Sequence, residues 1–249
     1  MRAILLLLAT TLCLFSTAQK NKKQREKYYV FDKDWKKTTT DKAVYMIYVE
    51  QKDDTTWQWN YYNYIGPLLY IETYRFEESD TPHGYFAWFN KKGKIDSCGT
   101  LYKGLKNGSW QYYGDSLNAQ ISQTYEYGKL VKEWKRSDNV KKPKETIAGE
   151  KEASFKNGIP GWKTYIQKNI TIPDRALKSR MSGTVNVGFV ILEDGNIGNI
   201  RVIRSVEFSL DQEGIRIIKK SPPWVPGEKD GKKVISYHVQ PMTFTVVGN

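Results

Sequence analysis

A glycine and aromatic pattern recurs in the first half of the chain and restricts the fold more than any other feature. Each copy predicts two short antiparallel strands joined by a glycine-bearing turn, such as Lys92-Gly93 or Asn107-Gly108. A single hairpin buries too little surface to be stable, so at least three such units must stack their aromatic rings on one another. We therefore expect a β-hairpin ribbon over residues 43–134. The copies are Gly84-Tyr85-Phe86-Ala87-Trp88-Phe89, Gly108-Ser109-Trp110-Gln111-Tyr112-Tyr113 and a weaker Trp59-Asn60-Tyr61-Tyr62.

This repeat resembles the MORN-type and related antitoxin-like repeats, in which glycine and aromatic residues recur along a ribbon of hairpins. The aromatic side chains, Trp110 among them, are expected to form the core of the ribbon rather than a ligand site. A second reading stays open, in which the ribbon docks a second envelope protein or the cell envelope itself.

The first 18 residues predict a cleaved signal peptide. Arg2 gives a positive start, an apolar run covers residues 4–15, and Ser16-Thr17-Ala18 provides the small residues at a cleavage site. The alternative is an uncleaved inner-membrane anchor facing the periplasm, but a spanning helix needs about 20 apolar residues. Export to the periplasm is the prediction, and it leaves Cys98 as the single cysteine of the mature chain.

Two charged stretches separate the predicted domains. Residues 19–42 form a basic leader, and residues 135–154 form a linker with few apolar residues and charges of both signs. The net charge is +12, yet no pattern of stacked aromatic and arginine residues indicates nucleic acid as a partner. With an apolar content of 39%, packed cores are expected and wholesale disorder is not.

Residues 155–249 predict a small α+β domain. A short helix is expected from Trp162 to Ile170, and the segment Gly183–Ile191 alternates as a strand that returns after the turn at Asp194-Gly195. Ser209, with Gln212, predicts the cap of a helix that begins at Leu210. A last strand from Val234 to Val246 contains Pro241, which lacks a donor and favours a place at the edge of a sheet.

The order of motifs in this segment resembles the TonB C-terminal domain, in the version common in Bacteroidetes-type bacteria. The resemblance implies a three-stranded antiparallel sheet with two helices packed on one face. It also implies binding, in the periplasm, of an extended segment of an outer-membrane transporter called the TonB box. The residues that carry it are Ile172-Pro173-x-x-Ala176, Gly183-x-Val185-x-Val187-x-Phe189, Asp194-Gly195, Leu210-Asp211-x-Glu213, Trp224-x-Pro226-Gly227, Asp230-Gly231-Lys232 and Pro241-x-x-Phe244.

An edge strand can accept a foreign strand through its unpaired backbone groups, so this partner is expected at the last strand. By resemblance, the segment before Pro173 also lies near the docked peptide. The predicted partner-binding residues are Ile170, Thr171, Ile172, Val234, Ile235, Ser236, Tyr237, His238 and Val239.

The sequence gives little support for a metal-binding protein or an enzyme. Two histidines and two cysteines leave almost no ligands for a metal, and no cofactor is predicted. Paired carboxylates or a nucleophile with its base cannot be assembled with any specificity, so the chain is not expected to be an enzyme. A homodimer formed by edge-to-edge pairing remains an alternative use of the same strand.

Overall fold

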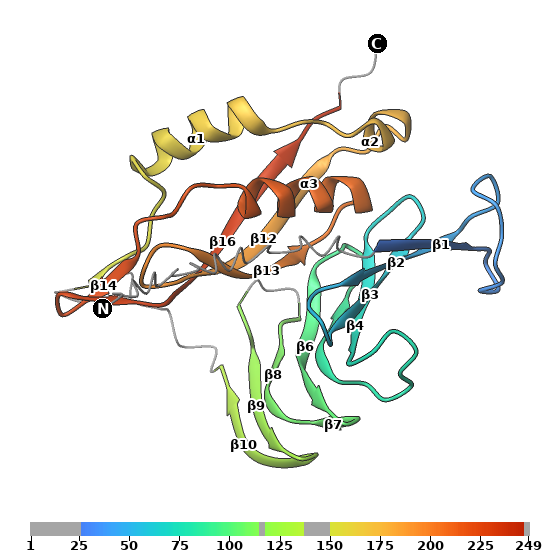
Figure 1. Ribbon diagram of the computed structural model, residues 1–249, viewed down its shortest axis with the longest axis horizontal. Helices are drawn as coiled ribbons and strands as arrows, with labels where there is room; N and C mark the ends of the chain where they lie inside the picture. Colours follow the sequence, from blue (N-terminus) through green and yellow to red (C-terminus); the bar gives the residue numbers. More distant parts are fainter. Residues whose placement is uncertain (1–25, 115–117, 137–149, 247–249) are drawn as a thin grey trace, which may run out of the picture.

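The computed structural model describes residues 26–114, 118–136 and 150–246. The predicted signal peptide and most of the predicted linker lie outside these residues. The described chain is α+β, with one long antiparallel sheet followed by two small three-stranded sheets and three helices (Figure 1).

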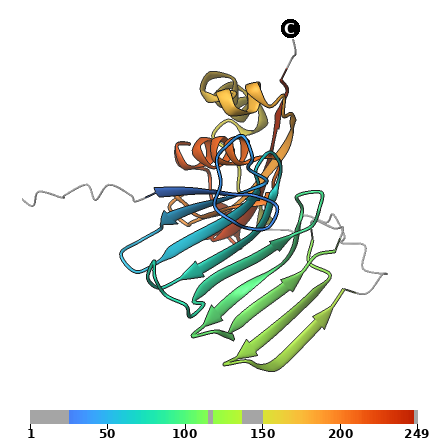
Figure 2. The same cartoon turned by 90° about the vertical axis from the view of Figure 1, so that its right-hand side faces the viewer.

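The long sheet, here called the ribbon, follows the order of the chain from β1 to β10, with the short β7 paired to β6. Figure 2 shows its strands side by side in one twisted layer. Its strands are β1 (Glu26–Phe31), β2 (Tyr45–Gln51), β3 (Trp57–Asn63), β4 (Leu68–Tyr74), β5 (Gly84–Phe89), β6 (Ile95–Tyr102), β7 (Leu105–Lys106), β8 (Gly108–Tyr112), β9 (Ile121–Glu126) and β10 (Lys129–Lys135).

The turns of the ribbon match the expected positions only in part. Gly93 closes the β5–β6 turn with a φ of 71°, and its N–H donates to Asn90 O at 2.8 Å. Asn107-Gly108, in contrast, does not make a hairpin turn. The chain reverses one turn earlier, at Lys103-Gly104, where both residues have positive φ. Two consecutive left-handed residues match the strand twist there, so Lys103-Gly104 takes the role that the sequence suggested for Asn107-Gly108.

The ribbon begins earlier than the expected boundary at residue 43. β1 pairs with β2 from Glu26 to Phe31, so part of the expected leader belongs to the sheet. The reason is visible in the burial pattern, because Val30 packs against the apolar core next to Met46. Tyr29, Val30 and Phe31 pack against buried clusters, and this packing makes the segment a strand although lysines surround it.

The C-terminal part contains a sheet of three strands in the order β13-β12-β16. Its helices are α1 (Gly158–Asn169), α2 (Asp174–Lys178) and α3 (Phe208–Lys219). The turn between β12 and β13 lies at Gly195, as the sequence predicted, with a φ of 85°. The strands are β12 (Gly183–Ile191), β13 (Ile197–Arg204) and β16 (Ser236–Phe244).

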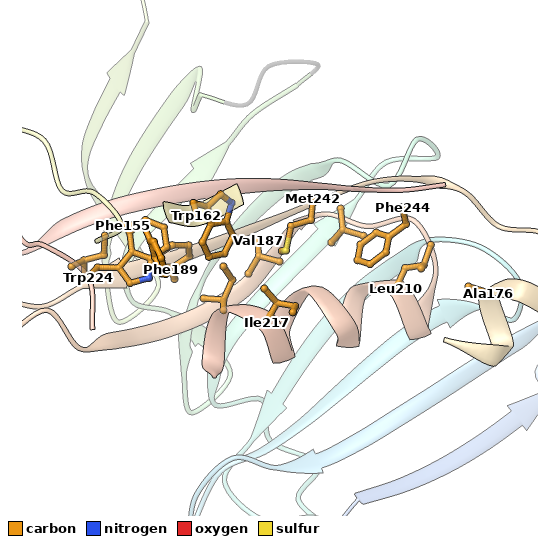
Figure 3. Close-up of a cluster of buried hydrophobic side chains, with 13 residues drawn as sticks. Phe155, Trp162, Ala176, Val187, Phe189, Leu210, Ile217, Trp224, Met242 and Phe244 are labelled. Atoms are coloured by element: carbon orange, nitrogen blue, oxygen red, sulfur yellow. The ribbon is translucent and has the colours of Figure 1, made fainter. Parts of the chain in front are cut away.

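One face of this sheet carries the apolar core of the C-terminal part. Figure 3 shows Val187 of β12 beside Ile217 of α3, and Phe189 of β12 beside Trp224. Alternate residues of β12 point toward α3, because side chains along a strand alternate between its two faces. The fully buried members include Val185, Val187, Phe189, Ile191, Leu210, Ile217 and Ile218.

Two helix boundaries differ from the sequence prediction. α1 begins at Gly158 rather than Trp162, directly after Asn157 in the left-handed conformation with a φ of 63°. α3 begins at Phe208, and its cap is Glu207 rather than Ser209. The Glu207 carboxylate accepts from Ser209 N at 2.8 Å and from Ser209 Oγ at 2.6 Å, so Ser209 donates to the cap.

A second small sheet joins the end of the expected linker to the loop after α3. It has the order β11-β14-β15, with β11 (Glu150–Lys151), β14 (Gly227–Lys229) and β15 (Lys232–Val234). The β14–β15 turn lies at Asp230-Gly231, as predicted, with both residues at positive φ. The last residues of the expected linker are therefore folded.

The ribbon and the C-terminal part share one apolar core. Met46, Tyr62 and Leu68 of the ribbon pack in the same cluster as Val202 and Ile203 of β13. Phe208 and Ile215 of α3 lie against this cluster, so α3 is packed on its other side by the ribbon. The two parts predicted as separate domains therefore stabilise each other.

Candidate functional site: an open sheet edge

β16 lies at the edge of the three-stranded sheet and pairs with β12 alone among the described strands. Its nine residues run antiparallel to β12 without a register shift, from Gly183↔Phe244 to Ile191↔Ser236. The backbone groups on its outer side therefore have no strand partner in the described part of the chain. This is the position that the sequence predicted from Pro241.

The register decides which residues of β16 face outward. Leu192 N donates to Asn196 O at 2.9 Å, so the backbone of Leu192 points toward β13. Neighbouring residues of a central strand point to opposite partners, and Ile191 and Phe189 therefore bond to β16. Their partners Ser236 and His238 face inward, which leaves Tyr237 and Val239 with backbone groups on the outer rim.

Pro241 obeys the same alternation. It lies opposite Asn186, which points toward β13, so the missing N–H of Pro241 falls on the outer rim. The inner ladder with β12 therefore loses no hydrogen bond to this proline. The next outward residue is Thr243, whose Oγ1 lies 2.9 Å from Thr184 Oγ1 of β12.

The side chains of β16 alternate between a covered and an uncovered face. His238 lies 5.4 Å from Phe189 and 5.1 Å from Trp224, measured between ring centroids. Burial in this aromatic surrounding lowers the pKa of His238, so its imidazole is neutral at pH 7. Tyr237 is 53% exposed on the opposite face. His238 is therefore a packing residue rather than an exposed contact.

Two of the predicted residues lie just before the rim. Val234 belongs to β15 and pairs with Gly227 in the other small sheet. Ile235 connects the two sheets and is 62% exposed. The edge strand therefore begins at Ser236, not at Val234, because the chain changes from one sheet to the other at Ile235.

The segment Ile170–Ile172 is held against α3. Thr171 N donates to Glu213 Oε1 at 2.7 Å, and Glu213 is also paired with Arg216 at 2.6 Å. Ile170 and Ile172 pack against the apolar core. Since its donor is already used and its apolar side chains are partly buried, this segment differs from β16, whose rim is open.

A buried polar cluster, which sequence reasoning did not find, joins α3 to the ribbon. Asp211 accepts hydrogen bonds from Ser205 Oγ, from Val206 N at 3.0 Å and from Tyr62 Oη at 3.2 Å. Burial raises the pKa of Asp211 to about 7, against the lowering effect of these three bonds. Asp211 belongs to the motif Leu210-Asp211-x-Glu213. Its partner Tyr62 is 149 positions away in the sequence, so the motif alone does not predict their contact.

Glu207 and Arg175 form a second link beside this cluster. They make an ion pair, and the Arg175 guanidinium also donates to Tyr64 O and lies 4.5 Å from the centre of the Tyr64 ring. Glu207 is fully buried. The C-terminal helices are thus fixed to the ribbon by charged groups as well as by apolar packing.

Within the described ranges, no cluster of three or more His, Cys, Asp or Glu residues could hold a metal ion. In the same ranges, no helix has the length and apolar character needed to cross a membrane.

Residues 168–246 match the family described as Gram-negative bacterial TonB protein C-terminal. The match begins in α1 and ends just after β16, so it contains the three-stranded sheet and the whole of α3. The matched residues do not include the ribbon, and the predicted MORN-type repeat is not confirmed by a family match. No curated protein and no solved structure matches the chain. The matched segment is therefore similar to the C-terminal domain of TonB proteins, a domain family of protein interaction.

Proposed function

We propose that this chain is a periplasmic TonB-like protein that captures an extended segment of an outer-membrane transporter by adding it as a fourth strand to β16. The open outer side of β16 is the observation that carries this proposal. Strand addition obtains affinity from main-chain hydrogen bonds and selectivity from alternate side chains. Strand capture needs no catalytic group. In this proposal, the binding supports energy-dependent transport through the outer-membrane transporter.

The outward backbone groups define where the captured strand pairs. Tyr237 and Val239 each offer a donor and an acceptor, whereas Pro241 offers an acceptor only. The continuous part of the rim is therefore Ser236–Pro241, and the pairing weakens beyond it. Ile170–Ile172 supports the sheet through α3 in this arrangement, and Val234 and Ile235 set the start of the edge.

A proline scan of β16 tests the proposal. Val239→Pro removes an outward donor, so the fold is expected to persist while affinity for a TonB-box peptide falls by about tenfold or more. Gln240→Pro removes an inner donor opposite Val187 and is expected to destabilise the sheet by about 3 kcal/mol. Peptide affinity is measured by fluorescence anisotropy and stability by urea unfolding.

Val239→Thr is the matched control, because it changes the side chain and keeps the N–H group. It is expected to bind the peptide within a few fold of the original chain. Undiminished binding by Val239→Pro would contradict capture at this rim. A stable Gln240→Pro variant with lost binding would show that the inner and outer residues are reversed.

A second candidate uses the face of the ribbon that points away from the C-terminal part. Stacked rings on this face join Trp35 to Tyr45 at 4.2 Å and Tyr61 to Tyr70 at 4.0 Å, and Trp88 is 39% exposed. Half-exposed aromatic rings are typical of protein interfaces. Here the ribbon would dock a second envelope protein. Crosslinking in the envelope tests this candidate, and loss of the crosslinked partner on Trp88→Ala is the expected result.

A further inference from the structure

An arginine of β13 joins the ribbon to the open edge strand. Arg201 and Tyr85 of β5 line the cleft between the ribbon and the C-terminal part. The Arg201 guanidinium lies 5.3 Å from the centre of the Tyr85 ring and 5.7 Å from the centre of the Tyr237 ring. Burial raises the pKa of Tyr237, and the charge and the hydrogen bond of Arg201 act against this rise. Arg201 therefore connects a ring of the ribbon with a ring of β16.

The contact between Arg201 and Tyr237 crosses the central strand, because β12 lies between β13 and β16. Gly188 of β12 lies opposite Arg201 on one side and opposite Val239 on the other. A Cβ at Gly188 would lie 2.3 Å from the Tyr237 hydroxyl oxygen, so a larger residue there would displace this side chain. The Tyr237 side chain therefore lies across Gly188 and points away from the outer rim.

A β-bulge in β13 comes directly before Arg201. Val190 pairs with Gly198 and Gly188 pairs with Arg201, so three steps along β13 lie opposite two steps along β12. Asn199 has a φ of 52° at this bulge. Bulges change the direction of side chains relative to a regular sheet. Here the bulge brings Arg201 opposite Gly188, where no side chain blocks the way to β16.

The ribbon end of this contact lies among other polar side chains. Burial raises the pKa of Tyr85, and the neighbouring Cys98 of β6 raises it further. Cys98 Sγ lies 3.9 Å from Tyr113 Oη, which donates to Gln111 Oε1 at 2.5 Å. Three strands of the ribbon therefore surround the tyrosine that Arg201 contacts.

The rim end of the contact is the residue that offers the first outward donor and acceptor of β16, Tyr237. Its neighbour His238 packs against Phe189 and Trp224 on the opposite face of the sheet. The strand is therefore held on both faces at this point. A rim whose backbone is already fixed loses less conformational entropy on capturing a peptide than a mobile rim does.

We propose that Arg201 and Tyr237 are positioning residues for strand capture, through which the ribbon holds the start of the open rim in the geometry that accepts a peptide. This inference rests on the proposed capture at β16. It gives the ribbon a part in peptide binding although the ribbon does not touch the captured strand.

Arg201→Gln tests the inference in the full chain, with the TonB-box peptide of the proline scan as the probe. Its affinity for the peptide is expected to fall by about fivefold, because the start of the rim becomes mobile. Tyr237→Leu is expected to give a loss of similar size, and the double variant no further loss, since both changes break the same contact. Arg204→Gln is the matched control on the same strand and is expected to bind within about twofold of the original chain.

NMR order parameters of the backbone N–H groups give a second readout, which a merely structural role of Arg201 would not change. In the free Arg201→Gln chain, the values at Tyr237 and Val239 are expected to fall from about 0.85 toward about 0.6, while the value at Val187 in the central strand stays the same. Tyr237 is 53% exposed, so Tyr237→Leu carries the same test if Arg201→Gln does not fold.

Unchanged peptide affinity in both single variants, or additive losses in the double variant, would overturn the inference. Order parameters at Tyr237 and Val239 that keep their original values would overturn it as well. Val239→Pro separates these results from the proposed function. If this variant loses the peptide while the Arg201 and Tyr237 variants keep it, capture at the rim stands and the positioning role is wrong.

Discussion

The buried carboxyl of Asp211 predicts how the stability of the protein depends on pH. Burial raises its pKa to about 7 in the folded chain, from 3.8 for an exposed aspartate. The folded state therefore holds a proton that the unfolded state has released over this range. The contribution of Asp211 to stability is therefore fully present below pH 3.8 and is lost as the pH rises toward 7, since the folded state binds more protons.

The size of this effect follows from the slope of the unfolding free energy against pH. One proton held by the folded state alone corresponds to about 1.4 kcal/mol for each pH unit. Between pH 5 and pH 6 the free energy of unfolding is therefore expected to fall by about 1.4 kcal/mol through Asp211. Above pH 7 both states are ionised and this contribution becomes constant.

Urea unfolding at pH 5, 6, 7 and 8 measures the effect, and Asp211→Asn is the matched control. The variant keeps the shape of the side chain and cannot ionise, while every other group titrates as before. The difference in unfolding free energy between the two chains is expected to follow the slope above. A difference that is flat between pH 5 and 7 would refute the reasoning, because the bonds from Ser205, Val206 and Tyr62 would then outweigh burial and keep the pKa low.

Two further predictions concern the ribbon. Trp110 is 3% exposed, so Trp110→Ala is expected to lower the unfolding free energy in urea by about 3–5 kcal/mol, and a loss below 1 kcal/mol would place the ring outside the core. A Cβ at Gly99 would lie 2.2 Å from the Trp110 ring, so Gly99→Ala is expected to cost about 1–3 kcal/mol by displacing that ring. In the Trp110→Ala background the additional cost of Gly99→Ala is expected to vanish, and a purely additive loss would rule out this contact.

Local patterns in the sequence located several elements correctly because the signals are short-range. Gly195 and Gly231 have the positive φ of the predicted turns, and Pro241 lies on a strand at the sheet edge. These features depend on the conformational limits of one or two residues. The turn predicted at Asn107-Gly108 was wrong, because the chain already reverses at Lys103-Gly104. Only the register of the paired strands decides between these two positions.

The edge strand was predictable from the sequence, but the residues that face outward from it were not. The sequence identified the last strand as the edge, but the alternation of inner and outer backbone groups depends on its register with β12. The hydrogen bond from Thr171 to Glu213 joins residues 42 positions apart and could not be read from either one. Sequence spacing does not report which buried groups of distant segments meet.

The sequence by itself determined that glycine and aromatic hairpins precede a small α+β domain with an edge strand, because propensities and turn residues act over a few positions. Only the tertiary structure decided that the two parts share a core through Tyr62 and Asp211, that α3 is packed between the small sheet and the ribbon, and that a cleft lies between them. These features arise from contacts between segments far apart in the chain, whose energies depend on burial and geometry that exist only after the chain has folded.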